Sequence, residues 1–207
     1  CVSVHGANRL GSNSLIDLVV FGRATGLFLK DNLKPNAPHK PLPADAADLA
    51  LGRLDHYRNA NGSTPTADIR LDMQRTMQKH AAVFRDSALL AEGVEQMQAV
   101  NKRLQDVKVT DRSLIWNTDL IETLELDNLI SQAVVTMRSA ENRKESRGAH
   151  MHEDFPDRDD ANWMKHTTST FEGWGGKSGK VELGYRPVHD YTLTDEIEYI
   201  KPKKRVY

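Results

Sequence analysis

The sequence predicts a mixed α and β protein, in which an opening loop and helix are followed by a small helical bundle and then by a β-hairpin. Apolar residues recur at helical spacing through the middle of the chain. Before them, residues 34–43 (KPNAPHKPLP) contain four prolines and no periodicity, which is typical of an extended linker. After them, apolar and polar residues alternate at 180–188 (KVELGYRPV) behind a glycine-rich turn. These observations divide the chain into 1–33, a linker at 34–43, a helical bundle at 44–145 and a C-terminal domain at 146–207.

The opening segment, HGANRLGSNSLIDLVVFGRATG at residues 5–26, predicts a loop that leads into a buried helix. Glycines in the loop allow sharp turns or a close approach to a ligand. Ser14, followed three residues later by Asp17, matches the signature of a helix start in which the hydroxyl caps free amides. We therefore expect the helix to begin at Ser14 or Leu15. Its residues 15–21 are apolar almost all round, which favours a position inside a large domain.

The start of this helix is the first candidate site. The amides of Ser14 and Leu15 are expected to point out of the positive end of the helix dipole, where negative charge is stabilised. Arg9 precedes them in the loop. Its guanidinium could bind a carboxylate or a phosphate through two parallel hydrogen bonds.

Four helices are expected in the bundle. The first spans residues 45–59 with Leu49 and Leu54 turned inward, and Thr64 and Pro65 open the second. The third runs from about 87 to 106, and Asn117 or Thr118 caps the fourth. Short connections between these helices favour antiparallel neighbours. The apolar positions predicted for the core of the last three helices are Ile69, Met73, Met77, Ala81, Phe84, Leu90, Val94, Met97, Val100, Leu104, Leu126, Leu129, Ile130, Ala133, Val134 and Met137.

The stretch from Arg143 to Thr167 is rich in charge and contains the second candidate site. Its spacing matches no standard zinc pattern and lacks the central glycine of a calcium loop, so we predict a solvated loop or an ion-pair network and no metal site. The side chains that could in principle hold a divalent ion are His150, His152, Glu153, Asp154, Asp157 and Asp159.

The C-terminal region predicts a hairpin over residues 168–188, with GWGGKSG as its turn, and a last strand from Thr194 to Ile200. Gly176-Lys177-Ser178 imitates the end of a phosphate-binding loop. The position where that motif needs its first glycine is Phe171, and a strand follows instead of a helix, so we interpret the segment as a turn. The basic ending, Lys201, Lys203, Lys204 and Arg205, is typical of a solvated tail or of a patch for an acidic partner.

The composition excludes several classes of function. A formal net charge of -1 gives no reason to expect a nucleic-acid partner. The single cysteine excludes a disulfide framework within the chain and fits a reducing compartment. No apolar run reaches the length of a membrane span.

The motifs resemble the succinate dehydrogenase flavoprotein family and, less closely, fumarate reductase flavoproteins and L-aspartate oxidases. The similarity is strongest in HGANRLGSNSLIDLVVFGRA, and it continues in ESRGAH, DFPDRDDANWMKHT and VELGYRPV, where Gly184 replaces the usual glutamate. The resemblance implies that residues 1–33 end a FAD-binding domain. It also implies that Arg9 binds a carboxylate of the substrate and that Ser14 and Leu15 contact the flavin. Arg147 and His150 would contribute to the wall of the site or to a contact between domains.

The same resemblance implies oxidation of succinate to fumarate by hydride transfer to FAD. Electrons would pass to an iron-sulfur subunit and through it to membrane-anchor subunits. The subunit would lie peripherally on the cytoplasmic face of a bacterial inner membrane or on the mitochondrial matrix face. The family's dinucleotide fingerprint, its flavin-linked histidine and its proton-shuttle arginine lie upstream of these motifs. We therefore expect a C-terminal fragment that contains no catalytic residue of its own and is inactive in isolation.

Three alternatives remain open at the level of sequence. A fumarate reductase would run the same chemistry in reverse, and an L-aspartate oxidase would share the first motif. A non-enzymatic helical docking module is the third alternative, in which Arg9 would be a surface anchor.

Overall fold

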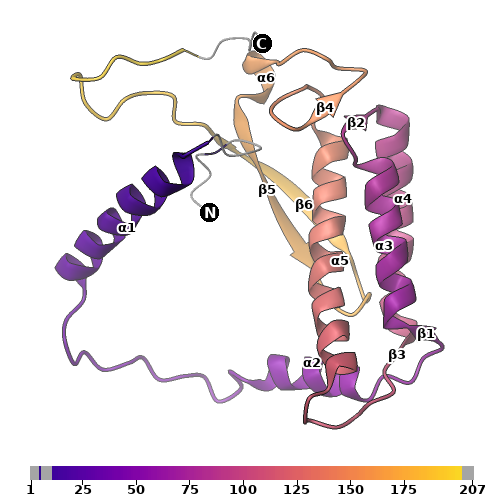
Figure 1. The fold of residues 1–207 in the computed structure, drawn as a ribbon. Helices are drawn as coiled ribbons and strands as arrows, with labels where there is room; N and C mark the ends of the chain where they lie inside the picture. Colours follow the sequence, from indigo (N-terminus) through magenta and orange to yellow (C-terminus); the bar gives the residue numbers. More distant parts are fainter. Residues whose placement is uncertain (1–4, 6–10, 202–207) are drawn as a thin grey trace.

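The computed structural model describes residue 5 and residues 11–201, and it contains both helices and strands, as predicted. Three long helices form an antiparallel bundle: α3 (Thr66–His80), α4 (Ser87–Arg103) and α5 (Thr118–Asn142) (Figure 1). A shorter helix, α2 (Asp48–Arg58), lies across the end of the bundle at which α5 begins. A 3-10 turn, η1 (Leu104–Asp106), extends α4 to the end predicted from the sequence.

The core of the bundle is formed by the faces that the helical spacing predicted. The side chains of Leu90, Met97, Val100 and Leu104 from α4 and η1 are buried, and Val94 packs at their edge. Helix α5 supplies Leu126, Ile130, Ala133, Val134 and Met137, and α3 supplies Ile69 and Met73. Met77 and Ala81 are partly buried against the same clusters, and Leu54 reaches the core from α2.

Three positions predicted to face the core are exposed instead. Leu49 is exposed, whereas Tyr57 and Leu54, which come later in α2, are the side chains of this helix that pack in the core. Leu129 lies on the outer side of α5, because a 25-residue helix packed on one side keeps a solvent-facing stripe. Phe84 is exposed because α3 ends at His80 and residues 84–85 form a strand.

Two of the predicted helix starts lie at or close to the observed ones. Asn117 caps α5 as predicted, since its side-chain oxygen accepts a hydrogen bond from the Leu120 amide at 2.8 Å. Thr64 and Pro65 directly precede α3, which begins at Thr66 with Pro65 as its capping residue, so this predicted start is also close to the observed one. The same two residues form β1 (Thr64–Pro65), which pairs in parallel with β3 (Val107–Lys108). A second parallel pair joins β2 (Phe84–Arg85) to β4 (Met151–His152).

The predicted hairpin is confirmed. After the short helix α6 (Asp160–Trp163), strands β5 (Lys165–Glu172) and β6 (Lys180–Pro187) pair antiparallel and pack against α5. The strand predicted from Thr194 to Ile200 is wrong: these residues form no strand, and each of the three sheets found among the described residues contains two strands.

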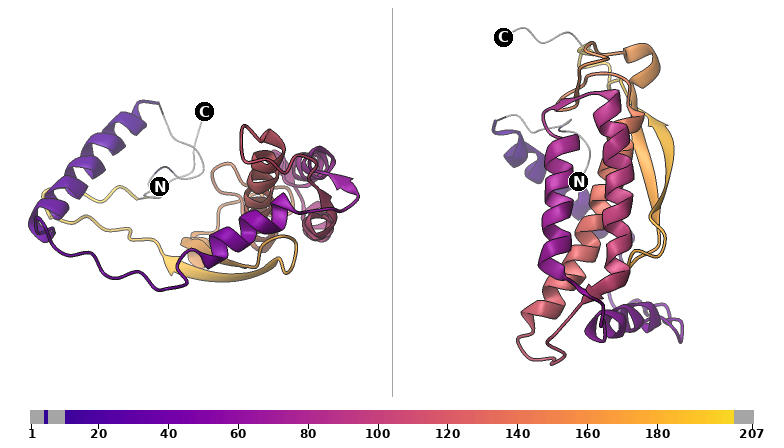
Figure 2. Two further views of the ribbon diagram at one scale, coloured as in Figure 1. Left: turned by 90° about the horizontal axis from the view of Figure 1, so that it is seen from below. Right: turned by 90° about the vertical axis from the view of Figure 1, so that its right-hand side faces the viewer.

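The first helix, α1 (Asn13–Asn32), stands apart from the bundle, to which the irregular segment 33–47 connects it (Figures 1 and 2). None of its residues is buried by the described elements, because none of these elements packs over its apolar surface. The prediction that this helix lies inside a larger FAD-binding domain stays a prediction. Over the described part of the chain, no helix has both the length and the apolar character needed to cross a membrane.

Candidate functional site

One side-chain hydrogen bond joins His5 to α1. Nε2 of His5 lies 2.8 Å from Oδ2 of Asp17, and both side chains are mostly shielded from solvent. This contact ties the beginning of the loop to the second turn of the helix. Arg9 lies outside the described residues, two positions before Gly11 in the sequence.

The cap predicted for this helix is wrong. The helix begins at Asn13, and its capping position is Ser12, whose φ of 66° is left-handed and whose side chain makes no capping hydrogen bond. Ser14 therefore lies inside the first turn. Asp17 does not serve as the acidic partner of a capping box, because its carboxylate is paired with His5.

The electrostatics at this helix end still suit a negatively charged group. No acidic residue lies in the first turn. The amide of Leu15 donates a hydrogen bond to the Ser12 carbonyl at 3.2 Å, so this amide is already paired. Helix geometry leaves the earlier amides, including that of Ser14, without a partner inside the helix. The Leu15 side chain is 68% exposed, and the space beside Gly11 is open. An apolar side chain therefore stands beside a positive helix end.

A second polar cluster, around Glu145, was predicted only in general terms as an ion-pair network. Glu145 is fully buried. Its carboxylate accepts hydrogen bonds from Arg143 at 2.6 Å, from Arg147 at 2.8 and 3.0 Å, and from the Asp159 amide at 2.9 Å. Burial alone would raise the pKa of Glu145, but these donors outweigh it and hold the pKa below its usual value.

The same arginines connect this cluster to the hairpin. Arg143 also donates to the carbonyls of Trp163 and Lys165, at 3.1 and 2.8 Å. Arg147 pairs with Asp160 at 2.8 Å. In the sequence, RKESR places Arg143, Glu145 and Arg147 at alternate positions, and in an extended chain that spacing puts all three on one side. This alternation was the signal that could have identified the cluster.

His150 lies between two arginines and is neutral in this arrangement. Its Nδ1 accepts a hydrogen bond from Arg85 at 2.9 Å, and its Nε2 donates to the Arg143 carbonyl at 3.0 Å. Burial, together with the nearby guanidinium of Arg85, lowers the pKa of His150. His152 beside it is fully buried, and neither ring nitrogen has a hydrogen-bond partner. Burial likewise lowers the pKa of His152.

These histidines and their acidic neighbours do not converge. Within residue 5 and residues 11–201, no group of three or more histidine, cysteine, aspartate or glutamate side chains is arranged to hold a metal ion. Asp154 instead accepts from the Ser87 amide at 2.9 Å, and Asp159 caps α6 through the Asn162 amide at 3.0 Å. The acidic side chains in this stretch thus stabilise turns and helix ends.

The turn GWGGKSG packs onto the bundle and leaves no cradle for a phosphate. The buried carboxylate of Asp127 on α5 accepts from the Gly175 amide at 3.0 Å and from Arg53 at 2.8 Å. The carbonyl of Gly176 accepts from Gln105 at 2.6 Å. All four turn glycines, Gly173, Gly175, Gly176 and Gly179, have positive φ, which explains why the turn needs them. The interpretation of this segment as a turn is confirmed.

The family comparisons agree with one another. Residues 70–207 match the family model described as fumarate reductase flavoprotein C-term. The chain is 55% identical over its whole length to the succinate dehydrogenase flavoprotein subunit of Rickettsia bellii, and 55% identical to the mitochondrial succinate dehydrogenase [ubiquinone] flavoprotein subunit of Oryza sativa. It covers 34% and 32% of those two proteins, so it spans about a third of the length of the relatives it matches.

The fold comparison adds a solved structure. The chain is similar to E. coli quinol fumarate reductase with a TM-score of 0.78 and 34% identity, covering 94% of this chain and 33% of that one. An adenylylsulfate reductase from Archaeoglobus fulgidus shares the fold at 17% identity and a TM-score of 0.56.

Proposed function

Because the chain belongs to the succinate dehydrogenase and fumarate reductase flavoprotein family, and corresponds to its C-terminal region, we propose that the complete protein oxidises succinate to fumarate. The single observation that carries the proposal is the agreement between the HGANRLGSNSL motif and the helix end that follows it. That end has no acidic residue in its first turn and presents an exposed apolar side chain, as a site for an anionic substrate beside an aromatic cofactor requires.

FAD is the cofactor that the family implies, and the described residues fit it. A flavin ring has an apolar face and gains negative charge on reduction near N1 and C2=O. Leu15 offers an apolar contact, and the positive end of α1 at Ser14 stabilises negative charge. When bound, FAD supplies the acceptor for the hydride that leaves succinate.

The roles proposed for this chain's residues are binding and orientation. Arg9 binds one carboxylate of succinate through its planar guanidinium and fixes the substrate in position. Ser14 and Leu15 hold the flavin at the helix end. We propose that the group that transfers the proton lies in the rest of the subunit, and that the 207-residue chain alone is inactive; the chain spans about a third of the length of its relatives.

The domain assignment follows from the same reasoning. We propose that residues 1–33 complete the FAD-binding domain, that 34–43 link it to the bundle at 44–145, and that 146–207 form the C-terminal domain. The exposed apolar surface of α1 supports this division, because an isolated helix of such composition needs a covering domain.

The proposed partners are an iron-sulfur subunit, which receives the electrons, and through it membrane-anchor subunits. The lack of a membrane-spanning helix among the described residues is compatible with a peripheral position, on the cytoplasmic face of a bacterial inner membrane or on the mitochondrial matrix face.

Fumarate reduction is the second candidate. It is supported by the structural similarity to quinol fumarate reductase and by 38% identity to a fumarate reductase flavoprotein subunit of Mycobacterium tuberculosis. The two directions share every residue role proposed above. Rates measured in both directions with the native quinone would separate them.

The test of the proposal is Arg9→Ala in the full-length protein. We expect kcat/KM for succinate to fall by about 100-fold, with KM raised and kcat lowered, because both binding and orientation are lost. Arg9→Lys keeps the charge but loses the paired geometry, so it should recover only part of the activity. Arg75→Ala, which removes an exposed arginine from α3, is the matched control and should leave both constants unchanged. Wild-type kinetics for Arg9→Ala would refute the assignment.

A further inference from the structure

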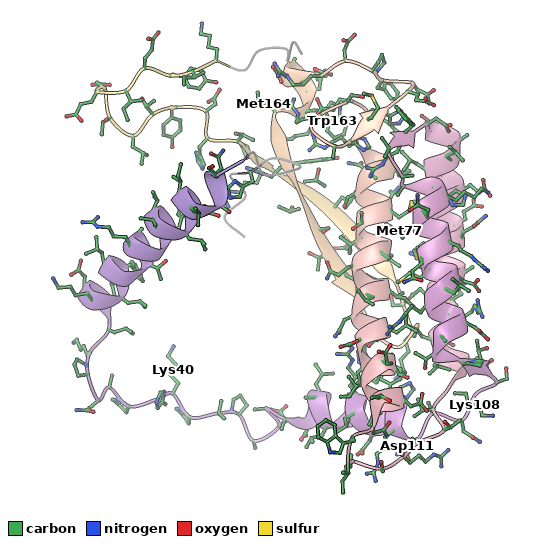
Figure 3. All side chains as sticks on the ribbon, in the orientation of Figure 1. Lys40, Met77, Lys108, Asp111, Trp163 and Met164 are labelled. Carbon is green, nitrogen blue, oxygen red and sulfur yellow. The ribbon has the colours of Figure 1, made fainter. Side chains whose placement is uncertain are left out.

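The loop between β3 and α5 exposes an unusual run of large apolar side chains. Leu114 and Ile115 are mostly exposed, and Trp116 is 94% exposed, although no chemistry in the proposed function uses them. The loop projects from the end of the bundle that α2 crosses, close to Asp111 (Figures 1 and 3). A tryptophan this exposed is unfavourable in water unless something covers it.

The loop is rigidly built even though its apolar side chains face outward. Asn117 donates to the carbonyls of Asp111 and Ser113 at 2.6 and 2.9 Å, and it also caps α5. Trp116 has a φ of 52°, a left-handed conformation that is strained for a bulky side chain. The hydrogen bonds of Asn117 hold the backbone of the loop in a conformation that leaves the indole ring of Trp116 exposed.

An apolar groove of about 340 Å³ lies beside this tryptophan. Its lining includes the apolar side chains of Leu54, Leu114, Trp116 and Ile121 and the acidic side chains of Glu122 and Glu125. Aromatic side chains that pack into pockets are common at the energetic centres of protein interfaces.

The charge around the groove selects the kind of partner. Residues 45–58 and 111–125 contain seven acidic side chains (Asp45, Asp48, Asp55, Asp111, Asp119, Glu122 and Glu125) and three arginines (Arg53, Arg58 and Arg112). These two segments together therefore carry a net charge of -4, while the whole chain carries -1. Glu122 is paired with Arg70, whereas Glu125 is exposed on the next turn of α5.

We propose that this groove is a docking site for another protein chain that inserts a large apolar side chain flanked by lysine or arginine. The apolar side chain fills the groove against Trp116, and its basic neighbours approach Glu125 and the acidic side chains of α2. The proposal does not depend on the substrate or the direction of the reaction, so it can fail while the proposed function stands.

The test places a photo-crosslinking residue, p-benzoylphenylalanine, at position 116 of the full-length protein, expressed with the subunits that assemble with it. We expect a crosslink to a separate polypeptide, at a segment with a large apolar residue and a lysine or arginine within a few positions. The control is the same probe at Leu193, which is also 94% exposed but does not line the groove. This variant should not give the product.

Two substitutions test the chemistry of the contact. Trp116→Ala should weaken binding of that partner by about tenfold or more, and Glu125→Lys should reduce the crosslink by a similar factor. Glu95→Lys, an exposed charge reversal on α4, should have no effect. Crosslinks only within the same chain, crosslinks to a second copy of it, or the lack of any product at position 116 would each overturn the proposal.

Discussion

Helices α1 and α5 are both long and rich in apolar residues, yet their surroundings are opposite. Helix α5 buries nine of its residues between α3, α4 and the hairpin. Helix α1 buries none, and even its central valine and leucine side chains are exposed. Apolar composition therefore does not decide burial by itself; burial requires neighbouring elements that the same chain brings into contact.

The pattern of the apolar residues already distinguishes the two helices. In α5 the apolar residues recur on one side, which fits a helix that packs on one face and is exposed to solvent on the other. In α1 they surround the helix, which fits an element enclosed by a larger domain. The relatives are about three times as long as this chain, so the covering part of α1 is expected in the rest of the subunit.

The largest effect is expected from a truncation in the core of α5. Ile130 is fully buried in the main core cluster. Ile130→Ala should lower the free energy of unfolding of the 207-residue chain by about 3 kcal/mol, because it removes buried methyl groups and leaves a cavity. Urea denaturation followed by circular dichroism measures this change.

The matched substitution in α1 tests the comparison directly. Leu18→Ala should change the stability of the 207-residue chain by less than about 0.5 kcal/mol, because this side chain is 68% exposed. In the full-length protein the same substitution should cost about 2 kcal/mol or more, once a covering domain buries the helix. A small effect in both contexts would show that α1 remains exposed in the complete protein.

The sequence predicted the bundle well because its evidence is local. Helical spacing, the Asn117 cap and the alternation in β6 act over a few residues, and each was confirmed. The errors came from contacts made at a distance. Phe84 was placed in a helix because its spacing fits, but its backbone pairs with Met151 far along the chain.

The candidate site could also be predicted only in part, because local spacing predicts the helix start but not the contacts made at a distance. A helix start was expected at Ser14, and the structure places it one residue earlier. The capping role failed because Asp17 pairs with His5, a contact that motif spacing does not reveal. The proposed roles of Arg9, Ser14 and Leu15 depend on groups outside this chain and stay predictions.

A smaller loss of stability is expected from a substitution at Glu145. This buried side chain anchors the segment after α5 to the fold, whereas no comparable contact among the described residues anchors α1 to the bundle. Glu145→Gln keeps the shape of the side chain but removes the charge that Arg143 and Arg147 share. The loss should be about 2 kcal/mol, the scale of a hydrogen bond to a charged group. Because the pKa of Glu145 is lowered in the folded protein, its contribution is present above the unfolded pKa and lost as pH falls through the folded value.

Thermal unfolding at neutral and acidic pH checks this prediction. The wild-type chain should lose more stability than Glu145→Gln between pH 5 and pH 3. Glu95→Gln, on the exposed side of α4, is the control and should follow the wild type. Identical acid sensitivity in all three proteins would mean that the network contributes no net stability.

The smallest effect is expected at the β2 and β4 pair, where His150 and His152 must stay neutral. Arg85 and Arg143 face His150, while Lys144, Asp86, Asp154 and Glu153 surround the strand of His152. Burial lowers the pKa of both histidines in the folded state, so acid favours the unfolded state, in which they protonate near pH 6.5. Stability should therefore fall by about 1 kcal/mol as pH decreases from 7.5 to 5.5.

His152→Phe should reduce this dependence on pH, because a phenyl ring fills the site without binding a proton. Neither ring nitrogen of His152 has a hydrogen-bond partner, so the substitution breaks no hydrogen bond of the ring and stability at pH 7.5 should change little. His39→Gln, in the exposed linker, should keep the wild-type slope. Hydrogen exchange at the Glu153 amide, which bonds to the Arg85 carbonyl at 2.7 Å, would locate the effect. If that amide exchanges no faster at pH 5.5 than at pH 7.5 after correction for intrinsic rates, the two histidines do not control this contact.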